Sequence, residues 1–400
     1  MTAGWQSRRR SFCRGGRTLR WLPVAVVAVM CSGCSSPAPV SPPPAEQLDV
    51  HPGESIQAAL DQAAATGCRR VVIHAGVYRP DRKRQALIWF NRQHDGIHVI
   101  GSGEVVLRGD NEQLAAADEP GYPAVVNHVV YFGDGVSSQT VLEHVRITGA
   151  NGFQTTEGTD EMQPETGVEQ LVRNQFFYSD GGGIKIFGRS SPKVVDVEIF
   201  ENDAQPCGGG VSIEHRGFRD QPAIFRNCVF RSNTCRITGS AVDVLPGSAA
   251  EFDNCLFVDN LSNNGIDDVS REGHKYNATH GCGALTVFHD SRVIVRRCTF
   301  TGNRNGVDDK GRGNTYADCL FWKNDAAGGV SPGERYECDI VHTVNVRNCF
   351  IGGGLADLRG SIDPDTNTLN IDDPQLNEAY VPQSPGMKDI GYRPLSPDPK

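Results

Sequence analysis

Two acidic residues in neighbouring sequence repeats, in adjacent outward columns, are the strongest candidates for chemistry. Glu214 follows the segment Val211-Ser-Ile213, and Asp243 lies inside Val242-Asp-Val244. We expect these side chains on adjacent coils, diagonally placed, with their carboxyl groups several ångströms apart. Paired carboxylates near that separation perform acid/base work on glycosidic bonds. They could instead hold a calcium ion that neutralises a carboxylate of the substrate.

Basic residues near this pair could bind substrate or move a proton. His215 and Arg216 follow Glu214 directly, Lys185 lies one coil earlier, and His289 lies two coils later. His215 is predicted to share in catalysis, while Lys185, Arg216 and His289 are predicted to bind substrate. The alternative is that these residues lie on a solvated sheet and are charged only for solubility.

A short pattern that occurs five times must position these residues. A cysteine or apolar residue is followed two positions later by an aromatic or aliphatic residue, and three positions after that by asparagine. The copies begin at Val197, Cys228, Cys255, Cys298 and Cys319. Each follows a glycine-led apolar alternation that is typical of a short strand. Strands this short, repeated every roughly 20–30 residues, predict a solenoid.

Alignment of the repeats predicts which side chains stack on one another. Cysteines, phenylalanines and asparagines should form inward columns, with the asparagine amides bonded from coil to coil. The cysteines lack the close pairs typical of zinc sites. Cys207 could pair with Cys235, and Cys282 and Cys338 are further disulfide candidates; the sequence does not fix the pairing, and free buried thiols are the alternative. Two outward columns are predicted: Lys185, Ser212, Asp243, Thr286 and Asp308, and beside it Phe187, Glu214, Leu245, Phe288 and Lys310.

One coil departs from the pattern. Asp309 falls where the other coils place an inward apolar residue, and a buried carboxylate is costly unless it is paired. Either Lys310 or Arg312 pairs with it, or the strand shifts register and turns early. The second explanation is favoured because this coil is one residue shorter than its neighbours. Three insertions, at residues 152–180, 262–281 and 325–340, are predicted to wall a groove beside the outward columns.

The first 33 residues read as an export signal. They carry six arginines, no acidic residue and an apolar run that is too short to span a membrane. Ser32-Gly33-Cys34 resembles a bacterial lipobox, which makes Cys34 a predicted lipidation site and the only membrane contact. A Pro/Ser-rich tether over residues 34–50 follows. Without the signal, 33 basic residues remain against 48 acidic ones, and a net charge of −15 argues against nucleic acid as a partner.

The ends of the body support a capped solenoid. Residues 55–65 place Ile56, Ala59, Leu60 and Ala63 on one helical face, which suits a helix that covers an open end. The segments from Ser55 to Pro80 and from Ile97 to Gly109, followed by the repeats, resemble the right-handed parallel β-helix superfamily that includes pectin and pectate lyases. Residues 372–392 resemble the closing segment of bacterial secreted members. The resemblance implies an all-β, single-stranded right-handed parallel β-helix over residues 51–360, with an irregular segment over 361–400.

The resemblance does not carry a catalytic site with it. The Trp-Ile-Asp-His and Arg-x-Pro-x-x-Arg motifs of pectate lyases are absent, as are the polygalacturonase set and the Asp-Pro-His motif of alginate epimerases. The leading hypothesis is a monomeric protein of the bacterial cell envelope, exposed to the periplasm or the exterior, that cleaves an extracellular polysaccharide as a lyase or a hydrolase. The alternative is a non-catalytic β-helix lipoprotein that binds glycan or supports adhesion.

Overall fold

The structure is a computed structural model of the chain. It describes residues 46–119, 121–152, 155, 175–205, 207–262, 283–324, 336–340, 342, 345–353, 358–360, 362–369 and 372–395. The chain divides into two units, Met1–Pro43 and Pro44–Lys400. The predicted signal, Cys34 and most of the tether therefore lie outside the described residues. So do most of the three predicted insertions, and with them the predicted groove wall.

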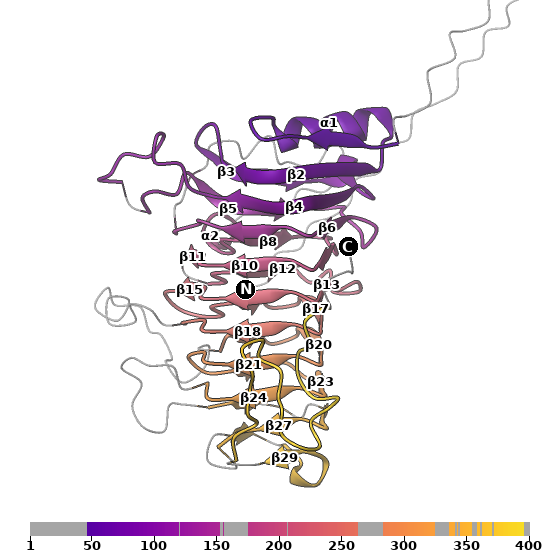
Figure 1. Cartoon of the computed structure of the whole chain (residues 1–400), viewed down its shortest axis with the longest axis vertical. Coiled ribbons are helices and arrows are strands. Elements are labelled where there is room, and N and C mark those ends of the chain that lie inside the picture. The colour runs from indigo at the N-terminus through magenta and orange to yellow at the C-terminus, as the bar shows by residue number, and fades with distance from the viewer. Residues whose placement is uncertain are drawn as a thin grey trace, which may run out of the picture. The chain divides into compact units, whose positions relative to one another are not determined.

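The unit Pro44–Lys400 is a stack of coils built from parallel strands (Figure 1). One face is a nine-stranded sheet: β3 (Arg84–Phe90), β5 (Val126–Phe132), β8 (Ile184–Phe187), β12 (Val211–Glu214), β16 (Val242–Val244), β19 (Leu285–Val287), β22 (Val307–Asp309), β25 (Cys338–Ile340) and β28 (Leu358–Gly360).

An 18-stranded sheet supplies the other two faces as two rows of strands. The first row is β1 (Leu48–Val50), β2 (Arg70–Tyr78), β4 (His98–Arg108), β6 (Val141–Glu143), β9 (Lys193–Val195), β13 (Ala223–Arg226), β17 (Ala249–Asp253), β20 (Arg292–Arg296), β23 (Thr315–Ala317) and β26 (Asn345–Arg347). The second row is the end of β4, then β7 (Arg146–Thr148), β10 (Glu198–Phe200), β14 (Val229–Arg231), β18 (Leu256–Val258), β21 (Thr299–Thr301), β24 (Leu320–Trp322), β27 (Phe350–Ile351) and β29 (Thr368–Leu369). The strands β11 (Asp203–Ala204) and β15 (Thr234–Cys235) pair separately. The predicted parallel solenoid is confirmed.

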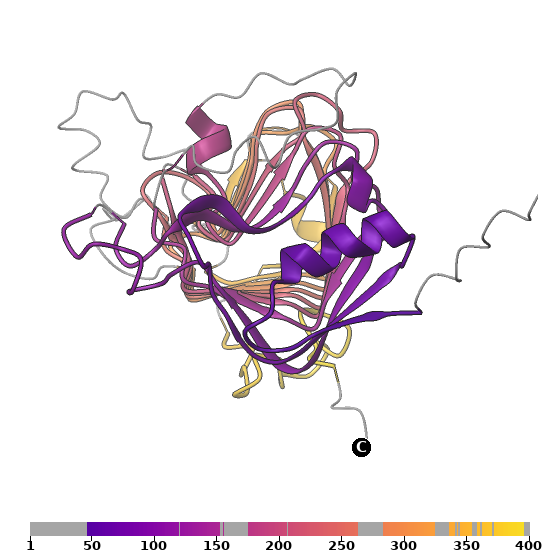
Figure 2. The ribbon, with the colours of Figure 1, turned by 90° about the horizontal axis from the view of Figure 1, so that it is seen from above.

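The predicted capping helix is confirmed as α1 (Ile56–Thr66). The Ser55 hydroxyl accepts a hydrogen bond from the Ala58 N–H at 3.2 Å, and Gly67 ends the helix with φ 77°. The helix buries Ile56, Leu60 and Ala63 and lies across the end of the stacked coils (Figure 2). It therefore covers apolar side chains that the first coil would otherwise expose. The remaining helices are short: α2 (Gln175–Ser179), η1 (Arg92–His94) and η4 (Pro364–Thr366).

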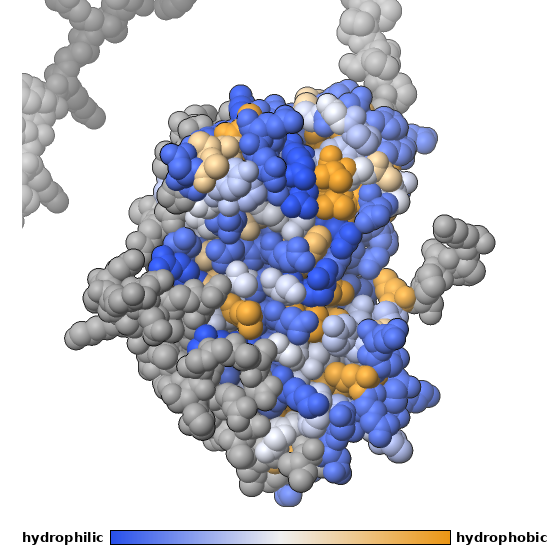
Figure 3. Space-filling view, turned by 60° about the vertical axis from the view of Figure 1, so that its left-hand side comes forward, coloured by the Kyte–Doolittle hydropathy of each residue, from blue (hydrophilic) through white to orange (hydrophobic). Residues whose placement is uncertain are grey.

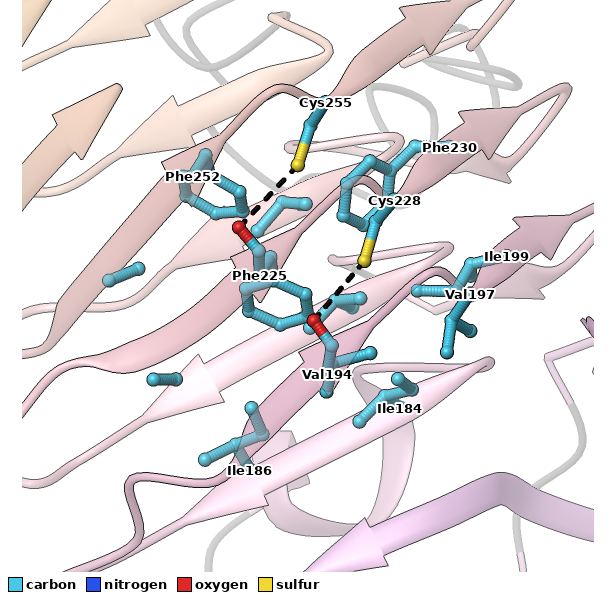
Figure 4. Close-up of a cluster of buried hydrophobic side chains, with 14 of the residues drawn as sticks. Ile184, Ile186, Val194, Val197, Ile199, Phe225, Cys228, Phe230, Phe252 and Cys255 are labelled. Carbon is cyan, nitrogen blue, oxygen red and sulfur yellow. Dashed lines mark hydrogen bonds between the residues drawn. The ribbon is translucent and has the colours of Figure 1, made fainter. Parts of the chain in front are cut away.

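The core consists of side chains stacked from coil to coil (Figure 4). Rings of neighbouring phenylalanines stack with centroids 4.6 Å apart for Phe230–Phe257, 4.3 Å for Phe257–Phe300 and 4.9 Å for Phe300–Phe321. The predicted cysteine column is also inward, since Cys228, Cys255, Cys298, Cys319 and Cys349 are fully buried. Their thiols donate to carbonyl oxygens, as Cys228 does to Val194 at 3.4 Å.

The cysteines of the described residues are all free thiols. The suggested Cys207–Cys235 disulfide is not formed: the Cys207 sulfur lies 3.0 Å from the Thr238 hydroxyl oxygen, and the Cys235 thiol donates to the Thr238 carbonyl at 3.0 Å. Cys338 is free as well, and Cys282 lies outside the described residues.

The asparagines form the predicted ladder. Each side-chain amide donates to the side-chain oxygen of the next asparagine, at 3.2, 3.0, 2.8 and 2.7 Å along the series Asn202, Asn233, Asn260, Asn303 and Asn324. Each amide also donates to a backbone carbonyl, such as Phe230 for Asn260 at 2.9 Å. These side chains are buried, and the ladder satisfies them by stacking.

Each coil bends at two places where a residue has positive φ. The residue before each inward cysteine has positive φ, as in Asn227 (55°), Asn254 (55°) and Asp318 (57°), and so does the residue before most ladder asparagines, as in Ser232 (54°) and Asp259 (56°). Asparagine and aspartate enter this left-handed region more readily than other non-glycine residues. The two bends hold the second-row strand between them.

Glycine precedes several strands of the nine-stranded sheet because the next coil passes very close. A Cβ atom at Gly183 would lie 2.6 Å from the Gly210 carbonyl oxygen, and one at Gly210 would lie 2.5 Å from the Ala241 carbonyl oxygen. No side chain larger than hydrogen fits at that distance. The glycine-led pattern is thus a packing requirement of the stack.

The explanation favoured for Asp309 is wrong. Strand β22 keeps its register, with Asp309 opposite Val287 on one side and Ile340 on the other, so the carboxylate points inward. Asn314 and Tyr316 donate side-chain hydrogen bonds to it at 2.8–2.9 Å, and the Gly311 N–H donates at 2.7 Å. Neither Lys310 nor Arg312 is needed. The shorter turn brings these donors within reach.

Both ends of the body depart from the simplest division of the chain. Leu48–Val50, within the predicted tether, form β1 and pair with β2. The C-terminal segment runs back along the outside of the second row, seen in yellow in Figure 1. Tyr392 packs on Leu256 and Val258, and the Asn254 side chain bonds both the N–H and the carbonyl of Arg393, at 2.8 and 2.7 Å. The segment therefore covers a sheet face.

Candidate functional site

The predicted outward column exists in the predicted register. Strand pairing places Lys185, Ser212, Asp243, Thr286 and Asp308 opposite one another on consecutive strands, and Asp339 of β25 extends the series. Each of these residues is buried, between 0 and 3 % exposed. The alternative interpretation, in which these residues lie on a solvated sheet and are charged only for solubility, is therefore wrong for this column. We call Asp243, Thr286, Asp308 and Asp339 the acid column.

Glu214 lies beside the start of this column and is held by two cations. The Lys185 ammonium donates to Glu214 Oε2 at 2.8 Å and to the Ser212 hydroxyl at 3.1 Å. The Arg216 guanidinium lies 3.2 Å from Glu214 Oε1. A buried carboxylate needs such pairing to offset its lost hydration. The structure thus brings together three predicted site residues, Lys185, Glu214 and Arg216, as an ion-pair cluster.

His215 lies in the turn between the nine-stranded sheet and the first row. Its Nδ1 accepts a hydrogen bond from the Ala249 N–H at 3.2 Å, and its own backbone N–H donates to the Ser248 hydroxyl at 2.9 Å. Burial lowers the pKa of the imidazole to about 4, so it is neutral at physiological pH. His289 lies exposed in a later turn, where its carbonyl accepts from the Gly247 N–H.

Asp243 is fully buried and bonded through one oxygen. The Thr238 hydroxyl donates to Asp243 Oδ2 at 2.7 Å, and Oδ1 has no hydrogen-bond partner within the described part of the chain. Burial raises the pKa of Asp243 to about 6, and the bond from Thr238 opposes that rise. The residue is therefore an acid that titrates near neutral pH.

Asp308 is the residue that sequence reasoning placed in the column without a role. Among the described contacts, neither of its carboxylate oxygens has a hydrogen-bond partner, and the Lys310 ammonium is 4.0 Å from Oδ2. Burial raises the pKa of Asp308 to about 8, which Lys310 opposes and the neighbouring aspartates reinforce. Thr286, between Asp243 and Asp308, has a buried hydroxyl that is likewise unpartnered in the described residues. The alignment of Asp308 with Asp243 in the repeats is the sequence signal that could have identified it.

Asp180 extends the acidic surroundings toward α2. Its side chain is fully buried, and Oδ1 accepts from the Cys207 N–H at 3.3 Å. Burial raises the pKa of Asp180 well above its usual range, and the charges of Asp243 and Glu214 add to this. The predicted pair Glu214 and Asp243 shares no hydrogen bond in the described structure, and Glu214 is paired with Lys185 and Arg216. Asp308 accepts no hydrogen bond from the described residues, and Asp243 and Asp180 each keep one oxygen without a partner among them.

The described residues outside the acid column offer no competing centre of this kind. In the described ranges, no group of three or more histidines, cysteines and acids is placed to hold a metal ion, so the suggested calcium has no such ligand set there. A hollow of about 220 Å³ lies near α1, lined by Tyr78, Arg79 and Arg84, away from the acid column. Figure 3 shows a mixed hydrophilic face broken by small hydrophobic patches. No helix of the described chain is long and apolar enough to span a bilayer.

The comparison with protein families agrees with the coils and their columns. The family described as the right handed beta helix region matches residues 88–279. The chain is a right-handed parallel β-helix protein. The matched range contains Lys185, Glu214 and Asp243, while Asp308 and Asp339 lie beyond it. The searches of curated proteins and of solved structures found no match. The β-helix family includes polysaccharide-active enzymes, but membership alone names no reaction.

Proposed function

We propose that this β-helix protein hydrolyses a polysaccharide at the acid column, with Asp243 and Asp308 as its catalytic pair. The observation that carries the proposal is their shared setting: two fully buried carboxylates, two strands apart on one outward column, with oxygens that the described residues leave without hydrogen bonds. A buried polar group without a partner is costly. A substrate hydroxyl, a glycosidic oxygen or a water molecule would supply the missing partner.

The separation of the pair favours an inverting reaction. Neighbouring strands lie about 4.8 Å apart, so residues two strands apart have Cα atoms about 9.6 Å apart. Inverting glycosidases hold their carboxyl groups about 6.5–9.5 Å apart, and retaining enzymes about 5–5.5 Å. The wider spacing leaves room for a water molecule between one carboxylate and the sugar.

The two environments assign the roles. With a pKa of about 8, Asp308 holds its proton at neutral pH and donates it to the glycosidic oxygen as the bond to the anomeric carbon breaks. With a pKa of about 6, Asp243 is ionised above that pH and takes a proton from the attacking water. The water oxygen forms the new bond to the anomeric carbon, and the leaving sugar departs as an alcohol.

The charge around the pair supports a neutral or cationic substrate. Cleavage by a lyase requires cations that bind the substrate carboxylate, but Lys185 and Arg216 are engaged by Glu214. The column itself adds further acids, Asp243, Asp308 and Asp339. A uronic acid would meet repulsion here. The column is closed to solvent in this structure, so opening is part of the proposed cycle.

A polysaccharide screen tests this proposal. The full chain is incubated with neutral, amino-sugar and uronic-acid polymers, and products are followed by reducing-end assay and by NMR of the first anomer released. Reducing ends of inverted configuration are expected. Asp308→Asn and Asp243→Asn should each lower the rate by about 10²–10⁴-fold, whereas Glu251→Gln, a half-buried acid in β17, should not.

Two results would overturn the hydrolase. Unsaturated products would show elimination, and full activity in folded Asp308→Asn and Asp243→Asn would place the chemistry elsewhere.

A second candidate is a non-catalytic glycan-binding protein. The closed column and the doubly paired Glu214 favour it, because neither leaves a reactive group open to solvent. Binding of a glycan in the same screen without any product would select this candidate.

The proposed location is the bacterial cell envelope, with anchoring through lipid on Cys34. Metabolic labelling with a fatty-acid analogue should mark the protein and fail to mark a Cys34→Ser variant. Labelling of both forms, or of neither, would contradict the anchor.

A further inference from the structure

The outer face of the first strand row carries a line of arginines on alternate strands. Pairing places Arg226 of β13, Asp253 of β17, Arg296 of β20, Ala317 of β23 and Arg347 of β26 opposite one another in succession. The three arginines are exposed, and Arg292, at the other end of β20, is exposed as well. We call Arg226, Arg292, Arg296 and Arg347 the arginine strip.

The spacing of the strip follows from the sheet. Arginines on alternate strands have Cα atoms about 9.6 Å apart, so the line from Arg226 to Arg347 covers about 19 Å along the solenoid axis. Parallel strands keep this line straight from coil to coil. A rigid row of cations with a regular repeat suits an extended polymer that carries charges at regular intervals.

The cations of the strip have no acidic partners among the described residues. Several other arginines are paired with acids: Arg79 and Arg108 with Asp110, Arg189 with Asp134, and Arg231 with Glu198. None of the four strip side chains makes a hydrogen bond or an ion pair with the described residues. The whole chain has more acids than bases, 48 against 39, so the missing partners do not reflect a shortage of acids.

The positions between the arginines do not cancel their charge. Asp253 is already paired with Arg297, which lies at the adjoining bend. Ala317 is a small, buried residue. On the neighbouring outward line, Ile224 and Ile294 flank Glu251, so a single unpaired acid faces the strip there. The face therefore holds an excess of positive charge on an acidic protein.

We propose that the arginine strip binds a linear anionic polysaccharide along the solenoid axis. Each exposed guanidinium would donate to carboxylate or sulfate groups of the chain, which Arg can do in a bidentate manner. This surface is separate from the acid column, since one lies on the 18-stranded sheet and the other on the nine-stranded sheet. The proposal goes beyond the hydrolase and does not depend on it.

The observations favour a polysaccharide over a membrane surface. The strip is one side chain wide, and no large hydrophobic residue of the described strands β13–β26 is strongly exposed beside it. Interfacial membrane binding requires apolar side chains that enter the lipid in addition to basic ones. A narrow charged line on a flat sheet instead matches a single extended chain.

Binding of the full chain carrying Cys34→Ser to polygalacturonate tests the strip, with dextran as the neutral polymer. The variant Arg226→Gln, Arg296→Gln and Arg347→Gln should bind at least tenfold more weakly than the parent. The single variant Arg296→Gln should lie between them. A control with the same loss of charge, Arg82→Gln, Arg312→Gln and Lys388→Gln, should change affinity less than twofold. These three residues are exposed and lie outside the strip.

The salt dependence gives a second readout. Binding should weaken as salt rises, and the slope of log affinity against log salt should fall by about two to three in the triple strip variant, about one for each lost contact. Asp308→Asn should bind as the parent does, which separates this surface from the proposed catalytic pair. Equal losses in the strip and control variants, absence of binding, or tighter binding to anionic lipid vesicles or duplex DNA would overturn the proposal.

Discussion

The interior of the solenoid and the acid column both stack polar side chains, but they differ in whether those side chains are hydrogen-bonded. Both place polar side chains on consecutive strands about 4.8 Å apart. In the interior, each ladder asparagine donates to the next and to the backbone. In the acid column, Asp243 Oδ1, the Thr286 hydroxyl and both Asp308 oxygens lack partners within the described residues. Amides can be donor and acceptor in turn along a stack, whereas ionised carboxylates only accept.

Two adjacent residues show the difference most sharply. Asp308 and Asp309 point to opposite faces of β22 because side chains alternate along a strand. Asp309 accepts bonds from Asn314, Tyr316 and Gly311, while Asp308 accepts none from the described residues. The interior acid is part of the scaffold. Burial of the outward acid without a partner raises the free energy of the folded state, and a ligand or a bound proton can lower it.

The largest expected effect is on the pH dependence of stability, through Asp308. Its pKa rises from 3.8 in the unfolded chain to about 8 in the folded one, so the folded state holds the proton longer. Stability should therefore fall as pH rises from about 4 to 8, by on the order of 5 kcal/mol from this group. Urea unfolding of Asp308→Asn should show a weaker pH dependence and a higher midpoint at pH 8. Unchanged pH dependence would show that Asp308 has a partner.

Removal of one rung of the interior ladder should cost less but still be severe. Asn260→Ala removes the acceptor of the Asn233 backbone N–H and of the Asn233 amide, and one of the two donors to the side-chain oxygen of Asn303. Each orphaned buried group costs about 1–3 kcal/mol, so we expect a loss of about 2–5 kcal/mol in the free energy of unfolding. Asp259→Asn, at the exposed bend beside it, is the matched control, because asparagine also tolerates the positive φ of this position. A loss below 1 kcal/mol in Asn260→Ala would contradict the ladder's role.

Tyr316→Phe tests whether hydrogen bonds set Asp309 apart from Asp308. The variant keeps the buried ring and removes the hydroxyl that donates to Asp309 at 2.8 Å. A bond to a charged group contributes about 1.5–3 kcal/mol, and the loss should be greatest at high pH, where Asp309 is ionised. Denaturation at pH 5 and pH 9 measures this. Equal losses at both pH values would mean that Asp309 does not change its protonation state between pH 5 and pH 9.

The smallest effect is expected at Thr238. Thr238→Val keeps the shape of the side chain and removes the hydroxyl that donates to Asp243. Because this bond lowers the pKa of Asp243, the variant should titrate Asp243 at higher pH, and the acidic limb of any activity profile should move the same way. NMR of the aspartate carboxyl carbon measures the pKa. Stability should fall by about 0.5–1.5 kcal/mol, and a pKa that stays or falls would refute the assigned bond.

The sequence predicted the columns well because a repeated period leaves little choice. Once Cys228, Cys255 and Cys298 were aligned, the inward and outward faces followed from the alternation of strands. The register of Lys185, Asp243 and Asp308 was correct for this reason. The error at Asp309 arose from a rule of burial that considered only charged partners. Its donors, Asn314 and Tyr316, are polar but uncharged, and their reach depends on how the turn folds.

The amino-acid sequence by itself determined the coil, its inward stacks and the alignment of the outward residues, since these depend on short-range alternation and a period. Tertiary structure alone decided that the outward column is buried, that Glu214 is bound by Lys185 and Arg216, and that Asp243 and Asp308 keep oxygens without partners in the described residues. Burial and pairing depend on side chains from different coils and on what covers them. The spacing of residues within one repeat does not specify these contacts between coils.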